Sequence, residues 1–296
     1  MIESLHDTVL IGAGKLAHSL LYALKKIQLV PALIIDKYEE NAKLLADAVE
    51  APEYGTSLDL AGGKKYKRFF ITVNDGSIKD VADHLAALDI DFPNASFVHF
   101  SGSLDSSELE SLREKGSAVA SLHFVQTFPT KQPVKLLGST AIIESDHTAL
   151  REEMMLTVSY LGTTPVLLDA KEKLINHLAA VFASNFVTSL ASVSAALTHS
   201  IGRNPMLWHT LMRTTTENII NKGYENALSG PIDRRDCIIV EKHLRYLESM
   251  GDENLRQLYI LHSLNLLELI RHREGALSDE HQKIAAYLEA ELKRTP

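Results

Sequence analysis

The feature that most constrains this chain is a short apolar segment that is broken by two glycines and resumes with helical spacing. It begins at Thr8. Gly12 permits a sharp turn out of a strand, and Gly14 has no side chain to hold a diphosphate away from the backbone. The free N–H groups of the following helix would face that diphosphate. The residues that this pattern places against a cofactor are Gly12, Ala13, Gly14, Lys15 and Leu16.

A second apolar run supports this interpretation, because it ends in Asp36, which stands 22 positions (36 − 14) after Gly14. An acidic residue at about this distance binds the 2′-hydroxyl of an adenosine ribose. The alternative is that the glycines only form a tight turn and that Asp36 only caps the next helix, residues 39–49. The order of strand, glycines, helix, strand and acid favours a dinucleotide site.

The identity of the dinucleotide depends on two neighbouring residues. Asp36 would repel a 2′-phosphate and favours NAD, whereas Lys37 could pair with that phosphate and favours NADP. The sequence therefore predicts NADP or NAD as cofactor and leaves the choice open.

Strand and helix patterns alternate up to residue 168. Strands are predicted at residues 68–73, 96–100, 118–123, 140–143 and 165–168, with helical segments between most of them. This alternation predicts an N-terminal Rossmann-type doubly wound parallel sheet, covered on both faces, over residues 1–168. Strand patterns are lacking from residue 169 to residue 296, so we expect an all-helical substrate and dimerisation domain there.

The helix predicted at residues 171–199 is apolar nearly all round, which places it at the centre of a domain or in a homodimer interface. Its polar residues His177, Ser184, Asn185 and Thr188 share one face. A buried polar face is costly unless its groups bond one another or a ligand. Hydrogen bonds between core helices would explain these residues, but four polar groups beside a dinucleotide domain favour a ligand.

Polar residues also lie at the ends of three predicted strands. Val73 ends the strand at 68–73 and Asn74 follows it, where the backbone would pass the ribose and nicotinamide of a cofactor. Ser101 follows the strand at 96–100, and His123 ends the strand at 118–123. Each segment could be an ordinary turn. Because ligands bind at the carboxyl ends of parallel strands, we expect these residues to lie near one site.

Composition excludes several classes of protein. The formal net charge of −8 argues against a nucleic-acid-binding surface. The single cysteine, Cys237, excludes an internal disulfide and a cysteine-based zinc site, so we expect no metal centre and a reducing, cytoplasmic location. We also expect no signal peptide, and no charge-free segment of membrane-spanning length.

Several motifs together resemble the Rossmann-like proteins that carry the DUF2520 domain. These motifs are Gly12-Ala-Gly14, His99-Phe-Ser-Gly-Ser-Leu104, Ser121-Leu-His123, Gln126-Thr-Phe128, Ala180-Val-Phe-Ala-Ser-Asn-Phe186 and Leu228-Ser-Gly-Pro-Ile232. The layout is more distantly similar to pyrroline-5-carboxylate reductase, prephenate dehydrogenase and 6-phosphogluconate dehydrogenase-like oxidoreductases. The resemblance implies a nicotinamide-dependent oxidoreductase with no assigned substrate.

Two positions depart from the family pattern. Phe124 stands where members usually have proline, and Asp36-Lys37 stands where they commonly have a serine–arginine pair suited to NADP. The first departure bears on the shape of the loop that carries His123. The second weakens any inference from the family about cofactor preference.

The residues suggest a mechanism as a hypothesis. His177 is the first candidate for the proton donor or acceptor, because the ordinary pKa of histidine lies near neutral. His123 is the second candidate. Asn185 would hold a substrate oxygen or nitrogen, as a lysine–asparagine pair does in the hydroxyacid dehydrogenases that this chain resembles. A hydroxy-acid and an imine substrate are not distinguished, and a non-catalytic NAD(P)-binding sensor or assembly protein is the alternative function.

Overall fold

A computed structural model describes residues 7–63 and 65–294 of the chain. The chain divides into two compact units, Met1–Leu190 and Ala191–Pro296. The division falls within one helix. The domain boundary predicted after residue 168 stays a prediction.

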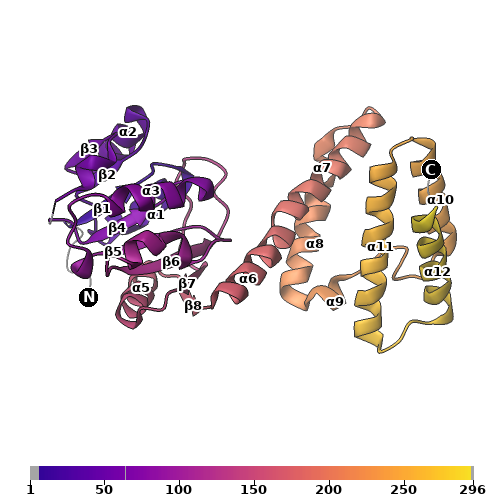
Figure 1. Ribbon diagram of the computed structural model, residues 1–296. Coiled ribbons are helices and arrows are strands. Elements are labelled where there is room, and N and C mark those ends of the chain that lie inside the picture. The colour runs from indigo at the N-terminus through magenta and orange to yellow at the C-terminus, as the bar shows by residue number, and fades with distance from the viewer. Residues whose placement is uncertain (1–6, 64, 295–296) are drawn as a thin grey trace. The chain divides into compact units, whose positions relative to one another are not determined.

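The first unit is built around one sheet, which has eight strands within the described residues (Figure 1). The strand order is β3-β2-β1-β4-β5-β6-β7-β8. Every neighbouring pair is parallel except β6 with β7. The strands are β1 (Thr8–Ile11), β2 (Leu33–Ile35), β3 (Glu53–Gly55), β4 (Arg68–Ile71), β5 (Ser96–His99), β6 (Ala118–Val125), β7 (Thr140–Glu144) and β8 (Thr164–Leu167).

Helices cover both faces of this sheet. Successive side chains on a strand point to opposite faces, so neighbouring residues of one strand belong to different cores. Leu10 of β1 lies in a core with apolar residues of three helices, and its neighbour Val9 lies in a second core with residues of two others. The first core takes α1 (Lys15–Lys26), α2 (Glu39–Val49) and α5 (Thr148–Tyr160); the second takes α3 (Ile78–Ala86) and α4 (Glu110–Arg113). The predicted doubly wound Rossmann-type sheet is confirmed.

Two details of the sheet differ from the sequence prediction. β3 is a short strand of exposed and half-buried residues, so it lacks the apolar run by which strands are recognised. β7 runs antiparallel to β6, with Leu122 opposite Ile143. The loop of residues 126–139 joins these two strands without the helix that usually connects parallel strands.

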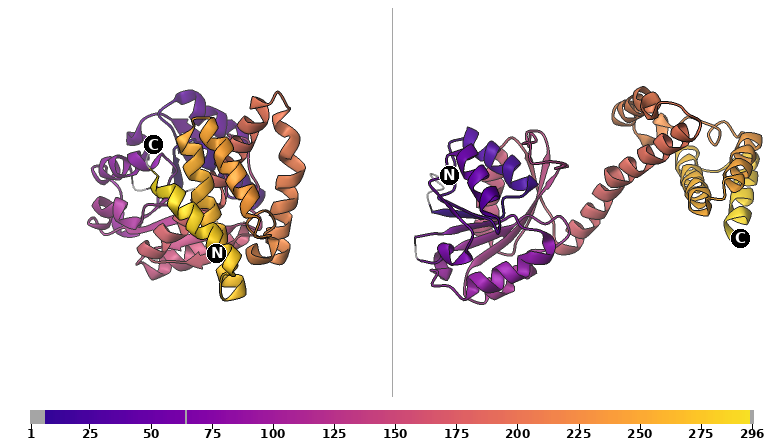
Figure 2. Two further views of the ribbon diagram at one scale, coloured as in Figure 1. Left: turned by 90° about the vertical axis from the view of Figure 1, so that its right-hand side faces the viewer. Right: turned by 90° about the horizontal axis from the view of Figure 1, so that it is seen from above.

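The second half of the chain is helical, and the described residues from 191 to 294 hold no strand (Figure 2). Val240, Ile260 and Ile284 belong to its apolar core. The helices are α6 (Ala170–Ala183), α7 (Asn185–Ser200), α8 (His209–Lys222), α9 (Tyr224–Ala227), α10 (Cys237–Ser249), α11 (Glu253–Glu274) and α12 (Asp279–Lys293). The predicted all-helical region is therefore confirmed. Short 3-10 turns are η1 (Leu58–Ala61), η2 (Asp75–Ser77), η3 (Phe92–Asn94), η4 (Ser106–Leu109) and η5 (Pro205–Trp208).

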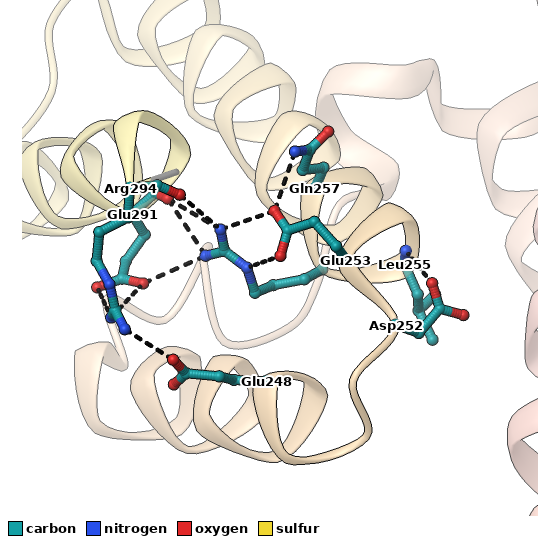
Figure 3. Close-up of polar contacts among 8 residues, drawn as sticks. Glu248, Asp252, Glu253, Leu255, Gln257, Glu291 and Arg294 are labelled. Carbon is teal, nitrogen blue, oxygen red and sulfur yellow. Dashed lines mark hydrogen bonds and ion pairs between the residues drawn. The ribbon is translucent and has the colours of Figure 1, made fainter. Parts of the chain in front are cut away.

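A buried arginine ties three helices of the second unit together. Arg256 of α11 donates to Glu253 one turn earlier and to Glu291 of α12, with N–O distances of 2.8 and 3.3 Å. It also donates to the backbone carbonyls of Glu291 and Arg294. Arg294 in turn bonds Glu248 of α10 at 2.7 Å (Figure 3). The buried positive charge is thus paired with carboxylates.

The predicted long apolar helix is divided at Ser184, whose backbone (φ −126°, ψ −67°) separates α6 from α7. The run Ala170–Ser200 is long and apolar enough to cross a membrane, by length and composition. Within it, residues 174–200 hold no Asp, Glu, Lys or Arg, so the expectation that no charge-free segment reaches membrane-spanning length was wrong. Asn, Ser, Thr and His residues interrupt the apolar run without adding a formal charge.

Candidate functional site

The glycine turn after β1 is held against the end of β4. Gly12 has a φ of 101°, and a Cβ built on it would lie 2.8 Å from the carbonyl carbon of Thr72. Thr72 donates its hydroxyl to the carbonyl of Gly12 at 2.6 Å. Gly14 is the N-cap residue of α1, and a Cβ there would meet only the Thr72 carbonyl, at 3.8 Å. Gly12 is thus required by the fold, whereas Gly14 leaves room beside the turn.

Asp36 lies at the end of β2 and braces this turn. One carboxylate oxygen accepts the N–H of Ala13 at 2.7 Å. The other accepts the N–H of Tyr38 at 2.9 Å and the amide of Asn41 at 3.3 Å. The carboxylate therefore joins the glycine turn to the start of α2, and much of its capacity to accept hydrogen bonds is used within the protein.

A pocket of about 390 Å³ opens beside the turn. It lies between the carboxyl ends of β1 and β4, where the strand order of the sheet reverses, which is the ligand position in open α/β sheets. Most of the predicted cofactor residues line it: Gly12, Ala13, Gly14, Asp36, Lys37, Val73 and Asn74. Asn41 and Lys131 also line it, although sequence reasoning missed both. Lys15 and Leu16 begin α1 outside this lining.

Histidines that are far apart in the sequence meet at the ends of β5 and β6. The ring centroids of His123 and His177 are 5.9 Å apart, with the rings nearly perpendicular. Gly102 lies against both: a Cβ there would be 2.5 Å from Nδ1 of His177 and 2.9 Å from Cε1 of His123. The structure thus brings together the two residues that were predicted separately as proton donors or acceptors.

Serines join the loop that lies against this histidine pair to the residues after β4. The hydroxyl of Ser101 accepts the N–H groups of Ser103 and Leu104 at 3.2 and 3.1 Å. The hydroxyl of Ser103 donates to Asp75 at 3.2 Å. Asp75 follows Asn74, which lines the pocket beside the glycine turn. The predicted cofactor residue Ser101 therefore lies with the histidines and holds the shape of their loop.

A buried lysine that the sequence analysis did not single out lies in the same group. Lys173 of α6 is 1% exposed and donates to the carbonyl of Leu104 and the hydroxyl of Ser121. Burial lowers the pKa of Lys173 to about 8, although nearby carboxylates act in the opposite direction. Its position four residues before His177 in an apolar helix was the available signal, since that spacing places both on one helix face.

The charge of Lys173 affects the histidines around it. Burial, followed by Lys173 and then His177, lowers the pKa of His123 to about 4. Burial and Lys173 likewise lower the pKa of His99 to about 4. Both rings are therefore neutral near pH 7. Nδ1 of His177 is buried and has no hydrogen-bond partner within the described part of the chain.

Asn185 is not brought into this histidine group. It begins α7 with an exposed side chain, eight residues after His177, which corresponds to about 12 Å along a helix axis. Thr188 is also exposed and donates its hydroxyl to the carbonyl of Ser184 at 3.2 Å. The assumption that one buried polar face carries all four residues fails, because only the His177 end of the run lies against the sheet residues.

The family predicted from the motifs is found in the comparisons. Residues 139–266 match the family described as "Domain of unknown function (DUF2520)". No curated protein is similar enough to this sequence to count as a match. The DUF2520 resemblance predicted from the sequence is therefore confirmed.

Solved structures show the same fold over most of the chain. A protein from Bacteroides fragilis described as a candidate NADP oxidoreductase is 27% identical, with a TM-score of 0.75, and the match covers 88% of this chain and 97% of that one. A protein from Thermotoga maritima is 25% identical, with a TM-score of 0.70 and coverage of 90% and 99%. Prephenate dehydrogenase from Aquifex aeolicus is 11% identical, with a TM-score of 0.54 and coverage of 90% and 99%, and shares the fold alone.

Proposed function

We propose that this protein is an NAD(P)-dependent oxidoreductase that transfers a hydride to or from a small substrate of the hydroxy-acid or imine class. One observation carries the proposal: a glycine-turn pocket and a group of buried proton-carrying residues occupy neighbouring strand ends of one sheet. The hydrogen bond from Ser103 to Asp75 connects the two. The Bacteroides fragilis relative, described as a candidate NADP oxidoreductase, supports the cofactor class.

The residues of this chain would bind the reactants and move one proton, while the bound cofactor supplies the hydride chemistry. His177 is the proposed proton donor or acceptor, because its buried Nδ1 lacks a partner that a substrate atom would provide. His123 is neutral near pH 7 and would donate or accept a hydrogen bond at the same substrate. Asn185 keeps its proposed role for a substrate that extends about 12 Å from His177 along the helix.

Lys173 is proposed as a positioning residue. Its ammonium contacts the backbone of the Ser101 loop at Leu104 and the hydroxyl of Ser121 in β6. It therefore holds the Ser101 loop to β6, and its charge, after burial, lowers the pKa of His123. It acts on the reaction through these neighbours, since its own side chain is buried beneath them.

The cofactor assignment is tested by thermal unfolding with NAD, NADH, NADP and NADPH in turn. A dinucleotide at a hundredfold excess over its Kd stabilises the folded protein by about 2.7 kcal/mol. We expect stabilisation by at least one oxidised and reduced pair. If none of the four raises the unfolding temperature, the assignment is contradicted.

Catalysis is tested with the same protein and a panel of hydroxy acids, oxo acids and cyclic imines, by following the absorbance of reduced nicotinamide. Replacing His177 by Ala removes the proposed proton carrier, so turnover should fall by about 10²- to 10⁴-fold while dinucleotide affinity stays within about twofold. Unchanged turnover in the variant would remove His177 from the mechanism. Dinucleotide binding without turnover of any panel member would favour the sensor or assembly function.

A homodimer is proposed through the exposed apolar surface of α6 and α7. Seven large side chains there are 40–58% exposed: Leu174, Ile175, Leu178, Phe182, Phe186, Val187 and Leu190. An apolar surface of this kind on a protein in water marks an interaction site. A second copy fits better than a bilayer, because Lys173 of the same helix is held by polar groups of the sheet, which lipid cannot supply.

Light scattering after gel filtration tests the homodimer, for which we expect about twice the chain mass of 32.8 kDa. Phe182→Asp should give monomers, whereas Leu44→Asp on α2, an equally exposed position, should leave the dimer intact. A monomeric wild-type protein would contradict the proposal. Recovery only with membranes or detergent would favour membrane insertion of the run Ala170–Ser200 and contradict the proposed cytoplasmic location.

A further inference from the structure

The pocket beside the glycine turn has a cationic end, of which the sequence indicated only Lys37. Two lysines, Lys37 and Lys131, line it together with a single carboxylate, Asp36, among the described lining residues. We propose that this end binds the 2′-phosphate of an adenine dinucleotide, so that the cofactor is NADP(H), and that Lys131 selects it. The inference rests on the proposed function.

Lys131 is brought to the pocket by the loop of residues 126–139 between β6 and β7. The N–H of Val134 donates to the hydroxyl of Ser19 in α1 at 2.9 Å. The ammonium of Lys131 donates to the side-chain carbonyl of Asn41 in α2. The loop is therefore fastened to both helices that flank the end of β2, and it holds a cation where the adenosine ribose of a dinucleotide lies.

The ammonium of Lys131 keeps N–H donors for a ligand. It carries three N–H groups, and Asn41 accepts one of them. Its positive charge also contributes, after burial, to a lowered pKa of His18 on α1. His18 is therefore neutral near pH 7 and does not compete for an anion. A phosphate bound in the pocket would therefore contact a lysine that Asn41 already holds at the pocket rim.

Asp36 is the group that would oppose a phosphate. Its two oxygens accept hydrogen bonds from the backbone of Ala13 and Tyr38 and from the amide of Asn41. A carboxylate offers about four acceptor sites, so about one remains for a ligand. These donors partly offset its charge. Two lysines and one braced carboxylate in the lining leave this end of the pocket with a net positive charge.

Asn41 couples the two opposing groups. Its amide nitrogen donates to Asp36, and its carbonyl accepts from Lys131. Both ends of the Asn41 side chain are thus used, which fixes the lysine beside the carboxylate. The contact of Lys37 with the ring of Tyr38, at 4.9 Å to the centroid, leaves its ammonium at the rim of the same pocket. A doubly charged phosphate would pair with both lysines.

Isothermal titration with two probes isolates this phosphate. The probes are adenosine 2′,5′-bisphosphate and adenosine 5′-monophosphate, which differ only in the 2′-phosphate. We expect the wild-type protein to bind the bisphosphate at least about tenfold more tightly. Lys131→Met should remove most of that difference and change the affinity for the monophosphate by less than about twofold. Lys135→Met, in the same loop but outside the pocket lining, is the matched control and should change neither.

NADPH and NADH titrations complete the test. NADPH should bind more tightly to the wild-type protein, and the excess should fall with rising salt, since it arises from charge pairing. If NADPH and NADH bind equally, or if Lys131→Met weakens both probes alike, the inference is overturned while the dinucleotide assignment stands. If neither dinucleotide binds, the proposed function fails and this inference fails with it. Circular dichroism spectra that match the wild type show that the variants are folded.

Discussion

Two buried cations, one in each unit of the chain, have different kinds of partner: one contacts carboxylates and the other contacts neutral oxygens. Arg256 is 5% exposed and contacts the carboxylates of Glu253 and Glu291. Lys173 is 1% exposed and contacts two neutral oxygens, those of Leu104 and Ser121. Contact with Glu253 is the main reason that the pKa of Arg256 is raised, whereas burial lowers that of Lys173 to about 8.

The kind of partner distinguishes a buried charge that stabilises the fold from one that can take part in proton transfer. A buried charge paired with carboxylates holds helices in place, and removing one partner leaves the other uncompensated. A buried ammonium beside neutral acceptors costs stability and titrates near physiological pH, which is typical of functional sites. The charge of Glu144 acts to raise the pKa of Lys173. The two carboxylate oxygens of Glu144 accept hydrogen bonds from the N–H and the hydroxyl of Ser106.

The largest effect is expected at Arg256. Arg256→Met should destabilise the protein by about 3 kcal/mol, because the largely buried Glu291 loses one of its two arginine partners and keeps only Arg294. Denaturant unfolding followed by the helical circular dichroism signal measures this change. Arg245→Met, which breaks an exposed pair with Glu241, should cost less than about 1 kcal/mol. Equal effects at both positions would show that the Arg256 cluster is no stronger than a surface ion pair.

At Lys173 burial of the charge costs stability, and this cost is expected to depend on pH. Its pKa is lower in the folded than in the unfolded chain, so the unfolded chain binds more protons between about pH 8 and the ordinary lysine value. Stability attributable to this residue therefore rises with pH in that window and is lost again as pH falls through 8. Relative to Lys173→Met, the wild type should gain on the order of 2 kcal/mol from pH 8 to 10.5. A pH-independent difference would contradict the lowered pKa.

A smaller effect is expected at His123, whose folded pKa of about 4 lies below its ordinary value. The unfolded chain binds more protons between pH 6.5 and 4, so the stability from neutral His123 declines as pH falls through this window. His123→Gln should reduce the slope of stability against pH by up to about 1 kcal/mol per pH unit. In Lys173→Met, the decline should end at a higher pH and be smaller in total, because the loss of the nearby positive charge raises the folded pKa of His123 towards its ordinary value. An unchanged slope in both variants would show that Lys173 and His123 are not coupled.

Much of the fold could be predicted because it depends on local patterns. The helix predicted at residues 39–49 is α2, with the same bounds in the structure. The glycine turn was recognised from Gly12 and Gly14, because few other backbone arrangements use that spacing after a strand. The long charge-free run was misjudged, since uncharged polar residues concealed its length.

The candidate site was predicted only in part, because its residues meet through contacts that span the sequence. His123 and His177 were named for their chemistry, but nothing in their spacing indicated that Gly102 would lie against both. The four-residue spacing of Lys173 and His177 places both on one helix face, but it gave no indication of the partners of the lysine, which lie far away in the sequence.

By itself, the sequence determined the strand and helix periods, the turn at Gly12 and the all-helical second half, because each depends on neighbours a few residues apart. The tertiary structure decided the rest. It set β4 beside β1 so that Thr72 closes against the turn, and it buried Lys173 among neutral oxygens. The loop from β6 to β7 carried Lys131 to Asn41, 90 residues away. Charge and burial at such positions arise from packing between distant segments, which no local pattern records.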